Sequence, residues 1–443
     1  MSPAETPPAR DRIPPRLTPV IYFLMAHAAL LAAFALAVAH PAEVSGYFYQ
    51  PRMIALVHLI TLGWITASIL GSLYVIGPMA LRSPMPEGRA DLIVALLYAI
   101  GLCGMVSHFW LNAYGGAGWA ALLVVGAALH VGFRALRSVR QAPVQPAVKL
   151  HLLLALVNLA LAGSLGILLA FDKAHPFLPA IELGNVMAHA HLAAIGWVGM
   201  MVMGTGLRML PMVLPAAMPA GKLSIPGALL TEAGILGVSG ILMLGSAALG
   251  GFALLVAAGF AVFLGQAIWM RRHLRPAPAG LPRPDLGVWH VLQALVYLLL
   301  AVALGIFLAF TPESDLTYRL APVYGVAGLL GFYGQLVLGI ESRILPMFAA
   351  YYANRRACGA GPVIQPHEMP RRGLQTAVFA LWSAGLPVLA AGMSLARPGL
   401  CRTGASLLLL AALALAINQA RVLAHLFRGK ASRPLSETAG GLS

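Results

Sequence analysis

Histidines inside apolar segments are the residues of this sequence best suited to carry chemistry. His58 and His191 each follow the start of a long apolar stretch at a similar distance, which puts both imidazoles at a similar depth in their helices. A neutral imidazole is a common ligand for haem iron, copper and zinc. The pair therefore predicts a haem or metal site, with His189 and His108 as further candidate ligands at comparable depth. The alternative is that each histidine only hydrogen-bonds between helices.

A second group of polar residues lies toward the other ends of the same segments. Arg208 and Arg343 each precede a proline by three residues and follow the first histidine position of their segment by seventeen, which is ~25 Å along a helix. With the nearby acids and histidines they could bind an anion or a quinone, or admit protons. The alternative is that they only lock the helix ends. The candidate inner polar site comprises Arg208, Arg343, Glu341, Glu232, His27, His151 and His290.

The composition places these residues in a membrane. The chain has 443 residues, of which 60% are hydrophobic and 10% charged, whereas a soluble domain carries about 25% charged residues. Apolar stretches long enough to cross a ~30 Å hydrocarbon core recur along the sequence. These features exclude a soluble enzyme, a disordered chain and a secreted disulfide scaffold. The three cysteines form no CxxC or CxxCH motif, which argues against covalently attached haem.

The basic residues predict the orientation of twelve spans. Most of the 29 lysines and arginines fall in loops on one side when the N-terminus is placed inside, so the positive-inside rule puts both termini in the cytoplasm. The net charge of +15 thus reflects orientation and not a nucleic-acid partner. We expect a bacterial inner-membrane protein with a single membrane domain, 18–430, between cytoplasmic tails, 1–17 and 431–443. The predicted spans are 18–40, 53–77, 91–111, 117–137, 149–171, 185–211, 224–248, 251–270, 287–310, 321–348, 374–395 and 402–427.

An internal repeat relates the second, sixth and tenth spans. The segments His58 to Pro78 and His191 to Pro211 share His-Leu, Gly-Trp, a second glycine and the final proline at the same spacing. The segment Val326 to Pro346 keeps both glycines and the proline, with Phe332 at the tryptophan position.

The spans that precede these segments also match. The stretches that begin at His151 and His290 both end in Leu-Gly-Ile-x-Leu-Ala-Phe, and His27 is expected to hold the corresponding place in the first span. No repeat is visible in the third span of each set. The repeat predicts an all-α protein whose twelve transmembrane helices form three four-helix arcs about a pseudo-threefold axis, roughly 18–140, 149–275 and 287–428.

This layout resembles subunit I of the haem-copper oxidases, in particular a reduced branch without oxidase activity. The run Arg-Ile-Leu-Pro-Met-Phe, from Arg343 to Phe348, resembles a segment of the NnrS-type membrane proteins associated with nitric oxide. The resemblance implies that His58 holds the place of the low-spin haem ligand, and that His191 or His189 holds that of a copper ligand. It implies a b-type haem as cofactor, with copper as a second candidate.

The sequence departs from the oxidase pattern where oxygen would be reduced. The seventh span has no histidine, the tenth has Val326 in place of one, and no tyrosine follows His189 or His191 by four residues. Oxygen reduction by the oxidase mechanism is therefore not expected. If haem is bound, His191 is expected to supply the second ligand beside His58.

Three functions fit these observations. The first is a membrane haem-binding redox or nitric-oxide-response protein, with no catalytic residue assigned, so that enzymatic activity stays open. The second is a cofactor-free transporter of a small solute or metal ion, and the third is a non-catalytic assembly subunit of a membrane complex. The expected partners are the lipid bilayer and a redox partner or other membrane subunits.

Overall fold

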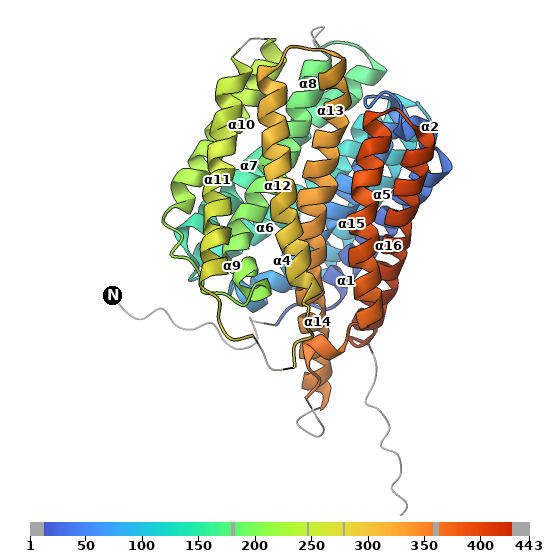
Figure 1. The fold of residues 1–443 in the computed structure, drawn as a ribbon. Helices are drawn as coiled ribbons and strands as arrows, with labels where there is room; N and C mark the ends of the chain where they lie inside the picture. Colours follow the sequence, from blue (N-terminus) through green and yellow to red (C-terminus); the bar gives the residue numbers. More distant parts are fainter. Residues whose placement is uncertain (1–12, 179–181, 246–247, 278–279, 358–362, 428–443) are drawn as a thin grey trace, which may run out of the picture.

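The structure is a computed structural model that describes residues 13–178, 182–245, 248–277, 280–357 and 363–427. Twelve of its helices are long and apolar enough to cross a membrane, as predicted. They lie side by side along one axis (Figure 1). We call the end at which the first of them begins and the last ends the inner end, following the predicted orientation. The predicted tails lie largely outside the described residues.

The spans are built from α-helices that three π-helical segments interrupt. In chain order the elements are α1 (Leu17–Ala39), α2 (Pro41–Val44), α3 (Pro51–His58), η2 (Leu59–Thr66), α4 (Ala67–Ala80), α5 (Arg89–Trp110), η3 (Tyr114–Gly116), α6 (Ala117–Gln141), α7 (Pro146–Ala174), α8 (Glu182–His191), η4 (Leu192–Gly199), α9 (Met200–Val213), α10 (Ser224–Leu244), α11 (Leu249–Arg272), α12 (Leu286–Phe310), α13 (Asp315–Val326), η5 (Ala327–Gly334), α14 (Gln335–Ala357), η6 (Pro366–Glu368), α15 (Arg372–Ser394) and α16 (Pro398–Ala424).

The tenth span is longer than predicted. The continuous helix runs from Asp315 to Arg355, whereas the sequence predicts 321–348. Ser314 caps its first turn by accepting a hydrogen bond from the backbone N–H of Thr317, which starts the helix ahead of its apolar part. At the other end α14 extends beyond the neighbouring helices (Figure 1).

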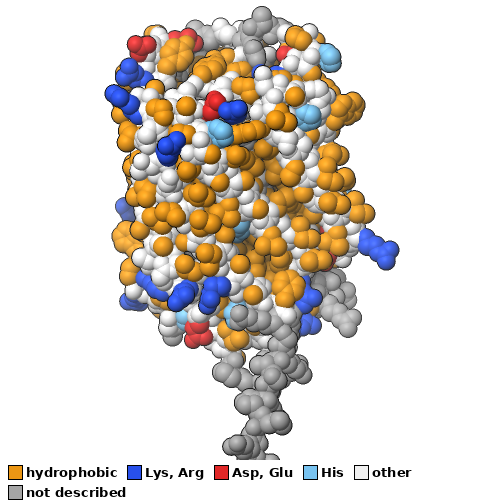
Figure 2. Space-filling view, turned by 90° about the vertical axis from the view of Figure 1, so that its right-hand side faces the viewer, with side chains coloured by type: hydrophobic (Ala, Val, Ile, Leu, Met, Phe, Trp, Pro, Cys, Tyr) orange, Lys and Arg blue, Asp and Glu red, His pale blue; other side chains and the backbone are white. Residues whose placement is uncertain are grey.

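The surface of the bundle matches a lipid environment. Large apolar side chains are exposed along its flanks, including Val296 (64%), Leu96 (58%) and Ile93 (57%). Hydrophobic side chains cover the middle of the face in Figure 2, and the charged ones lie mostly toward its two ends. Because an exposed apolar belt of this extent is stable only in lipid, the protein is an integral membrane protein.

The three π-helical segments coincide with the internal repeat. They begin directly after His58, His191 and Val326, which are the matched positions of the sequence. The aromatic residue six positions farther along is buried in each one, as Trp64, Trp197 and Phe332. The repeat therefore has a structural counterpart, since π-helices are rare and often mark functional sites. The arrangement of the arcs about an axis stays a prediction.

The first shared glycine of each repeat packs against the preceding long span. A Cβ at Gly63 would lie 2.5 Å from the Cβ of Ala29, so η2 and α1 approach as closely as two backbones allow. The equivalent glycines meet Asn158 and Tyr297 in the same way; the pairs are Gly63–Ala29, Gly196–Asn158 and Gly331–Tyr297.

The second shared glycine fixes the register of these helices and corrects one expectation. Its neighbours across the interface are paired as Gly71–Tyr22, Gly204–His151 and Gly339–His290. On α1, α7 and α12 the residue that meets the second glycine comes seven positions before the residue that meets the first glycine. The pairs are Tyr22 and Ala29, His151 and Asn158, and His290 and Tyr297. Tyr22 is therefore the counterpart of His151 and His290. The expectation that His27 holds this place is wrong, because it lies more than one turn farther along α1.

Candidate functional site

The outer part of the bundle brings His58 together with His189. His58 ends α3 and His189 lies near the end of α8, and their ring centres are 6.3 Å apart with an angle of 21° between the planes. Both rings are partly exposed. Phe109 of α5 stacks on His58 with its ring centre 5.1 Å away. The arrangement puts two imidazoles and one phenyl ring in contact inside the apolar belt.

In the part of the chain that the structure describes, each of the two histidines is hydrogen-bonded through Nδ1 and not through Nε2. The Nδ1 of His58 lies 2.8 Å from the carbonyl oxygen of Ile54, and the Nδ1 of His189 lies 2.8 Å from that of Ala162. A carbonyl only accepts, so each Nδ1–H donates and the neutral ring keeps its lone pair on Nε2. A backbone carbonyl on the other ring nitrogen is the usual support of a metal-bound histidine. The donor set therefore fits a metal ligated through Nε2.

The separation of the rings also fits a shared metal. Imidazole nitrogens that ligate one metal at ~2.0–2.1 Å on opposite sides have ring centres about 6.4 Å apart. The observed distance of 6.3 Å between the ring centres of His58 and His189 is close to this value. Among the described residues no group of three or more His, Cys, Asp or Glu is placed to hold a metal ion. Two protein ligands suit haem iron, whose macrocycle supplies the other nitrogens, better than a bare copper or zinc ion.

The structure places His189, and not His191, beside His58. The Nδ1 of His191 donates to the carbonyl of Met187 at 2.8 Å, and its ring stacks on Tyr324 of α13 with centres 6.0 Å apart. The two histidines are two residues apart on α8, hence about 200° apart round the helix. The face that packs toward α3 therefore carries His189, and the pairing of His58 with His191 expected from matched depth is not found.

One other expectation for this region also changes. His108 does not join the pair: its Nδ1 lies 2.5 Å from the carbonyl oxygen of Ala113, and its Nε2 faces Gly116 in the outer turn. The shared glycines Gly63 and Gly196 face Ala29 and Asn158 across helix interfaces, so they serve helix packing.

The candidate inner polar site is dispersed into separate contacts. Glu232 accepts a hydrogen bond from the side-chain amide of Asn158 at 2.7 Å. The Nδ1 of His151 donates to the carbonyl of Ala147, 2.8 Å away. Arg208 is partly buried, and no hydrogen bond or ion pair of its side chain is found among the described residues.

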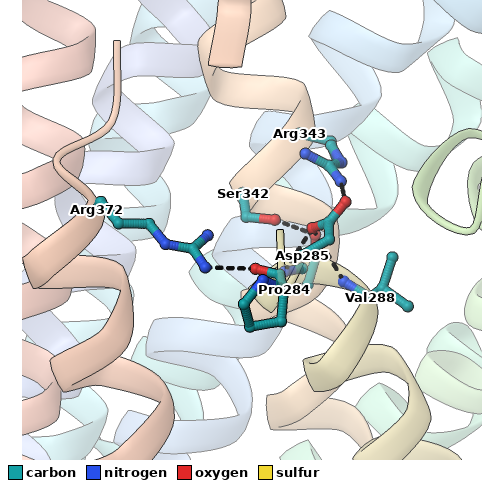
Figure 3. Close-up of polar contacts among 8 residues, drawn as sticks. Pro284, Asp285, Val288, Ser342, Arg343 and Arg372 are labelled. Carbon is teal, nitrogen blue, oxygen red and sulfur yellow. Dashed lines mark hydrogen bonds and ion pairs between the residues drawn. The ribbon is translucent and has the colours of Figure 1, made fainter. Parts of the chain in front are cut away.

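Arg343 has the counterion that Arg208 lacks. It forms an ion pair with Asp285, the residue that caps α12 (Figure 3). One oxygen of Asp285 accepts hydrogen bonds from the backbone N–H groups of Gly287 and Val288 at 3.1 and 3.4 Å. Arg372 donates to the carbonyl of the neighbouring Pro284 at 2.5 Å. The contacts tie α14 and α15 to the start of α12, which supports the interpretation that Arg343 locks the helix ends.

His290 belongs to a side-chain network between α12, α14 and α15. Its Nδ1 contacts the amide oxygen of Gln335, whose amide nitrogen donates to Gln293 at 2.9 Å. The hydroxyl of Ser383 donates to the same Gln293 oxygen at 2.8 Å. The histidine stands out in the sequence but its partners do not, because lone glutamine and serine residues on three helices give no spacing signal.

His27 forms the remaining inner contact. Its Nε2 lies 3.4 Å from a carboxylate oxygen of Glu341 in α14, and both side chains are buried. Of the predicted inner residues, these are the two that meet directly.

Comparisons with known proteins agree with the fold. The structure is similar to a solved heme-copper terminal oxidase dimer, determined by cryo-EM, with a TM-score of 0.58 and 14% sequence identity. The likeness covers 94% of this chain and 85% of that chain. No protein-family model and no curated protein matches the sequence. At this identity the likeness concerns the fold alone: the chain is an all-α integral membrane protein with twelve spans and a haem-copper oxidase-like fold.

Proposed function

We propose that this protein binds a b-type haem in the outer part of the membrane and acts in electron transfer, and that His58 and His189 would hold its iron. The observation that carries the proposal is the pair of neighbouring imidazoles, whose ring centres are 6.3 Å apart and whose Nδ1 atoms are each bonded to a backbone carbonyl. The haem-copper oxidase-like fold supports it as an analogy. The setting implied by the sequence is the bacterial inner membrane, with a redox protein or another membrane subunit as partner.

The chain's own residues would prepare and protect this site. The carbonyls of Ile54 and Ala162 fix the ring orientation and raise the basicity of each Nε2. Phe109 covers one face of His58, which limits access of water from the outer side. When bound, haem with two histidine ligands supplies a reversible one-electron carrier. Copper is the weaker candidate because two imidazoles leave a bare ion short of ligands.

A response to nitric oxide is the second candidate function. It is supported by the resemblance of the run Arg343 to Phe348 to NnrS-type proteins. If His58 and His189 both held the iron, a gas would have to displace one of them. Electron transfer is therefore the first candidate, since it needs no such exchange.

The test is an optical spectrum and a pyridine haemochrome assay on the full chain, purified from haem-supplied cells. His58→Ala and His189→Ala should each abolish or strongly weaken haem binding, because each removes an axial ligand. His191→Ala and His108→Ala are the matched controls and should keep the wild-type spectrum. Wild-type protein without a haem spectrum would refute the proposal and favour the transporter or assembly-subunit alternatives. Loss in His191→Ala with retention in His189→Ala would refute the ligand assignment.

A further inference from the structure

Glu341 of α14 is a buried carboxylate with almost no compensation. It is 1% exposed, and neither of its carboxylate oxygens has a hydrogen-bond partner in the part of the chain that the structure describes. The other fully buried acid, Asp91, is bonded by Tyr74 and Gly88 and paired with Arg134. The polar group nearest to Glu341 is the Nε2 of His27, 3.4 Å away.

The pair is buried inside the helix bundle, near its inner end. Glu341 lies two residues before Arg343, whose partner Asp285 caps the start of α12. His27 is 6% exposed. An ionised carboxylate that is buried without a proton or a cation is strongly unfavourable.

The orientation of His27 determines what can lie between the two groups. Its Nδ1 is 2.6 Å from the carbonyl oxygen of Phe23, which only accepts, so Nδ1 carries a hydrogen. If the ring is neutral, Nε2 then presents a lone pair to Glu341. If the ring were neutral and the carboxylate ionised, two hydrogen-bond acceptors, Nε2 and the carboxylate oxygen, would lie against each other in a low dielectric. One proton between Nε2 and the carboxylate removes this conflict, either as an ion pair or as an acid bonded to imidazole.

We propose that His27 and Glu341 form a proton-binding site that holds one proton between α1 and α14. The site is independent of haem, because it uses none of the residues of the outer histidine pair. It joins the first and third repeats of the sequence, and it exists in one copy because the positions equivalent to His27 are Leu156 and Leu295.

The titratable groups on the helices packed against the pair have other partners or stand apart from it. Tyr74 and Tyr98 of α4 and α5 donate to Asp91 and to the carbonyl of Leu62. His290 of α12 is bonded to Gln335, and Arg343 of α14 is paired with Asp285. Arg208 of α9 forms no ion pair with Glu341 in the described part of the chain. Tyr22 of α1 packs toward Tyr74 and Tyr98. Helix α16, which packs against α1 and α14, contributes the buried neutral side chains Asn418 and Gln419. Among the described residues, His27 is therefore the titratable group that lies within ion-pair distance of Glu341.

Infrared difference spectroscopy on the full chain in nanodiscs tests the site, with pH as the only variable. Wild type should show a carboxyl signal that titrates and shifts in deuterated water, and Glu341→Gln should lose it together with one proton per chain in indicator titrations. His27→Gln should shift the same signal, since it removes the partner base. Glu232→Gln is the matched control and should change neither. Glu341→Asp, which keeps a carboxyl group, should retain the signal at a shifted position.

Three outcomes would overturn the proposal. They are a Glu341 signal that His27→Gln leaves unchanged, the absence of any titrating signal dependent on Glu341, and a signal that follows sodium or potassium concentration at fixed pH. The last would mean that the pair binds a metal cation. The measurement needs no haem, so its failure is distinct from failure of the proposed function.

Discussion

Replacement of Arg343 and Arg208 by methionine compares two arginines that occupy the same place in the repeat. Both stand in an Arg-x-Leu-Pro-Met sequence, seventeen residues after His191 or Val326. Arg343 pairs with Asp285, whereas no partner of Arg208 is found among the described residues. Methionine keeps most of the apolar stem of arginine and removes only the charge and its donors. The comparison therefore isolates the contribution of the counterion Asp285 to stability.

The expected magnitude follows from burial. The side chains of Arg343 and Asp285 are 17% and 16% exposed, so the pair is neither on the open surface nor fully buried. Exposed pairs contribute about 0–1 kcal/mol, and breaking a buried pair costs 3–5 kcal/mol. We expect Arg343→Met to lower the free energy of unfolding by about 2–3 kcal/mol, between these limits. Arg208→Met should change it by less than about 0.5 kcal/mol, or raise it, because an uncompensated cation is removed.

Reversible unfolding in mixed micelles, read by circular dichroism, measures these changes. Asp285→Asn completes a double-mutant cycle, since asparagine still caps the first turn of α12. The coupling between Arg343→Met and Asp285→Asn should be about 1–3 kcal/mol. A loss in Arg208→Met as large as that in Arg343→Met would refute the reasoning, because the stability would then come from the shared position. A cycle without coupling would refute the role of the ion pair.

The remaining predictions concern the packing of the repeats. Gly63→Ala should destabilise the fold by about 1–3 kcal/mol, because the new Cβ would lie 2.5 Å from that of Ala29; Ala29→Gly should restore most of the loss, and Gly126→Ala, at a site with open space, should cost nothing. Tyr98→Phe should cost about 1–3 kcal/mol, since it leaves the buried carbonyl of Leu62 without the donor now 2.8 Å away. The same unfolding assay measures both, and a neutral Tyr98→Phe would contradict the role of this bond.

The spans could be predicted because membrane insertion depends on local properties. Length and apolar composition decide whether a segment can cross the hydrocarbon core, and both are visible in any window of the sequence. The register of α1 could not be predicted in the same way. Leucine and alanine dominate the first spans, so His27 matched His151 and His290 as well by eye as Tyr22 does. Only the glycine contacts across the interface distinguish the two alignments.

The partner of His58 depends on the rotation of α8, which no local pattern contains. His189 and His191 are nearly opposite on that helix, and the packing of α8 against α7 and α10 decides which one faces inward. Depth along the chain predicted that histidines of these two helices lie at one level, but it left undetermined which histidine of α8 faces His58. The bond of His189 to the carbonyl of Ala162, on α7, shows the contact that sets this rotation.

The third spans of the first and third repeats show why residue identity can hide a shared role. Tyr98 of α5 donates to the carbonyl of Leu62 in η2, and Trp382 of α15 donates to that of Leu330 in η5. Leu62 and Leu330 are equivalent, each four residues after His58 or Val326. A π-helical turn weakens the regular i→i−4 pairing and calls for an outside donor, which a phenol or an indole supplies equally. The sequences of these two spans therefore show no match although the structure has an equivalent contact in both.

The repeats agree where they pack and differ where they could do chemistry. All three keep the glycines, the π-helical segment and a buried aromatic ring, because each must seat one long span against the next. The residue directly before the π-helical segment is not needed for this packing, and it differs between the repeats as His58, His191 and Val326. Only the first of these meets a second imidazole, from α8 of the next repeat. The three sequence repeats thus offer three equivalent positions, and the side chains that differ between them confine the proposed haem site to one.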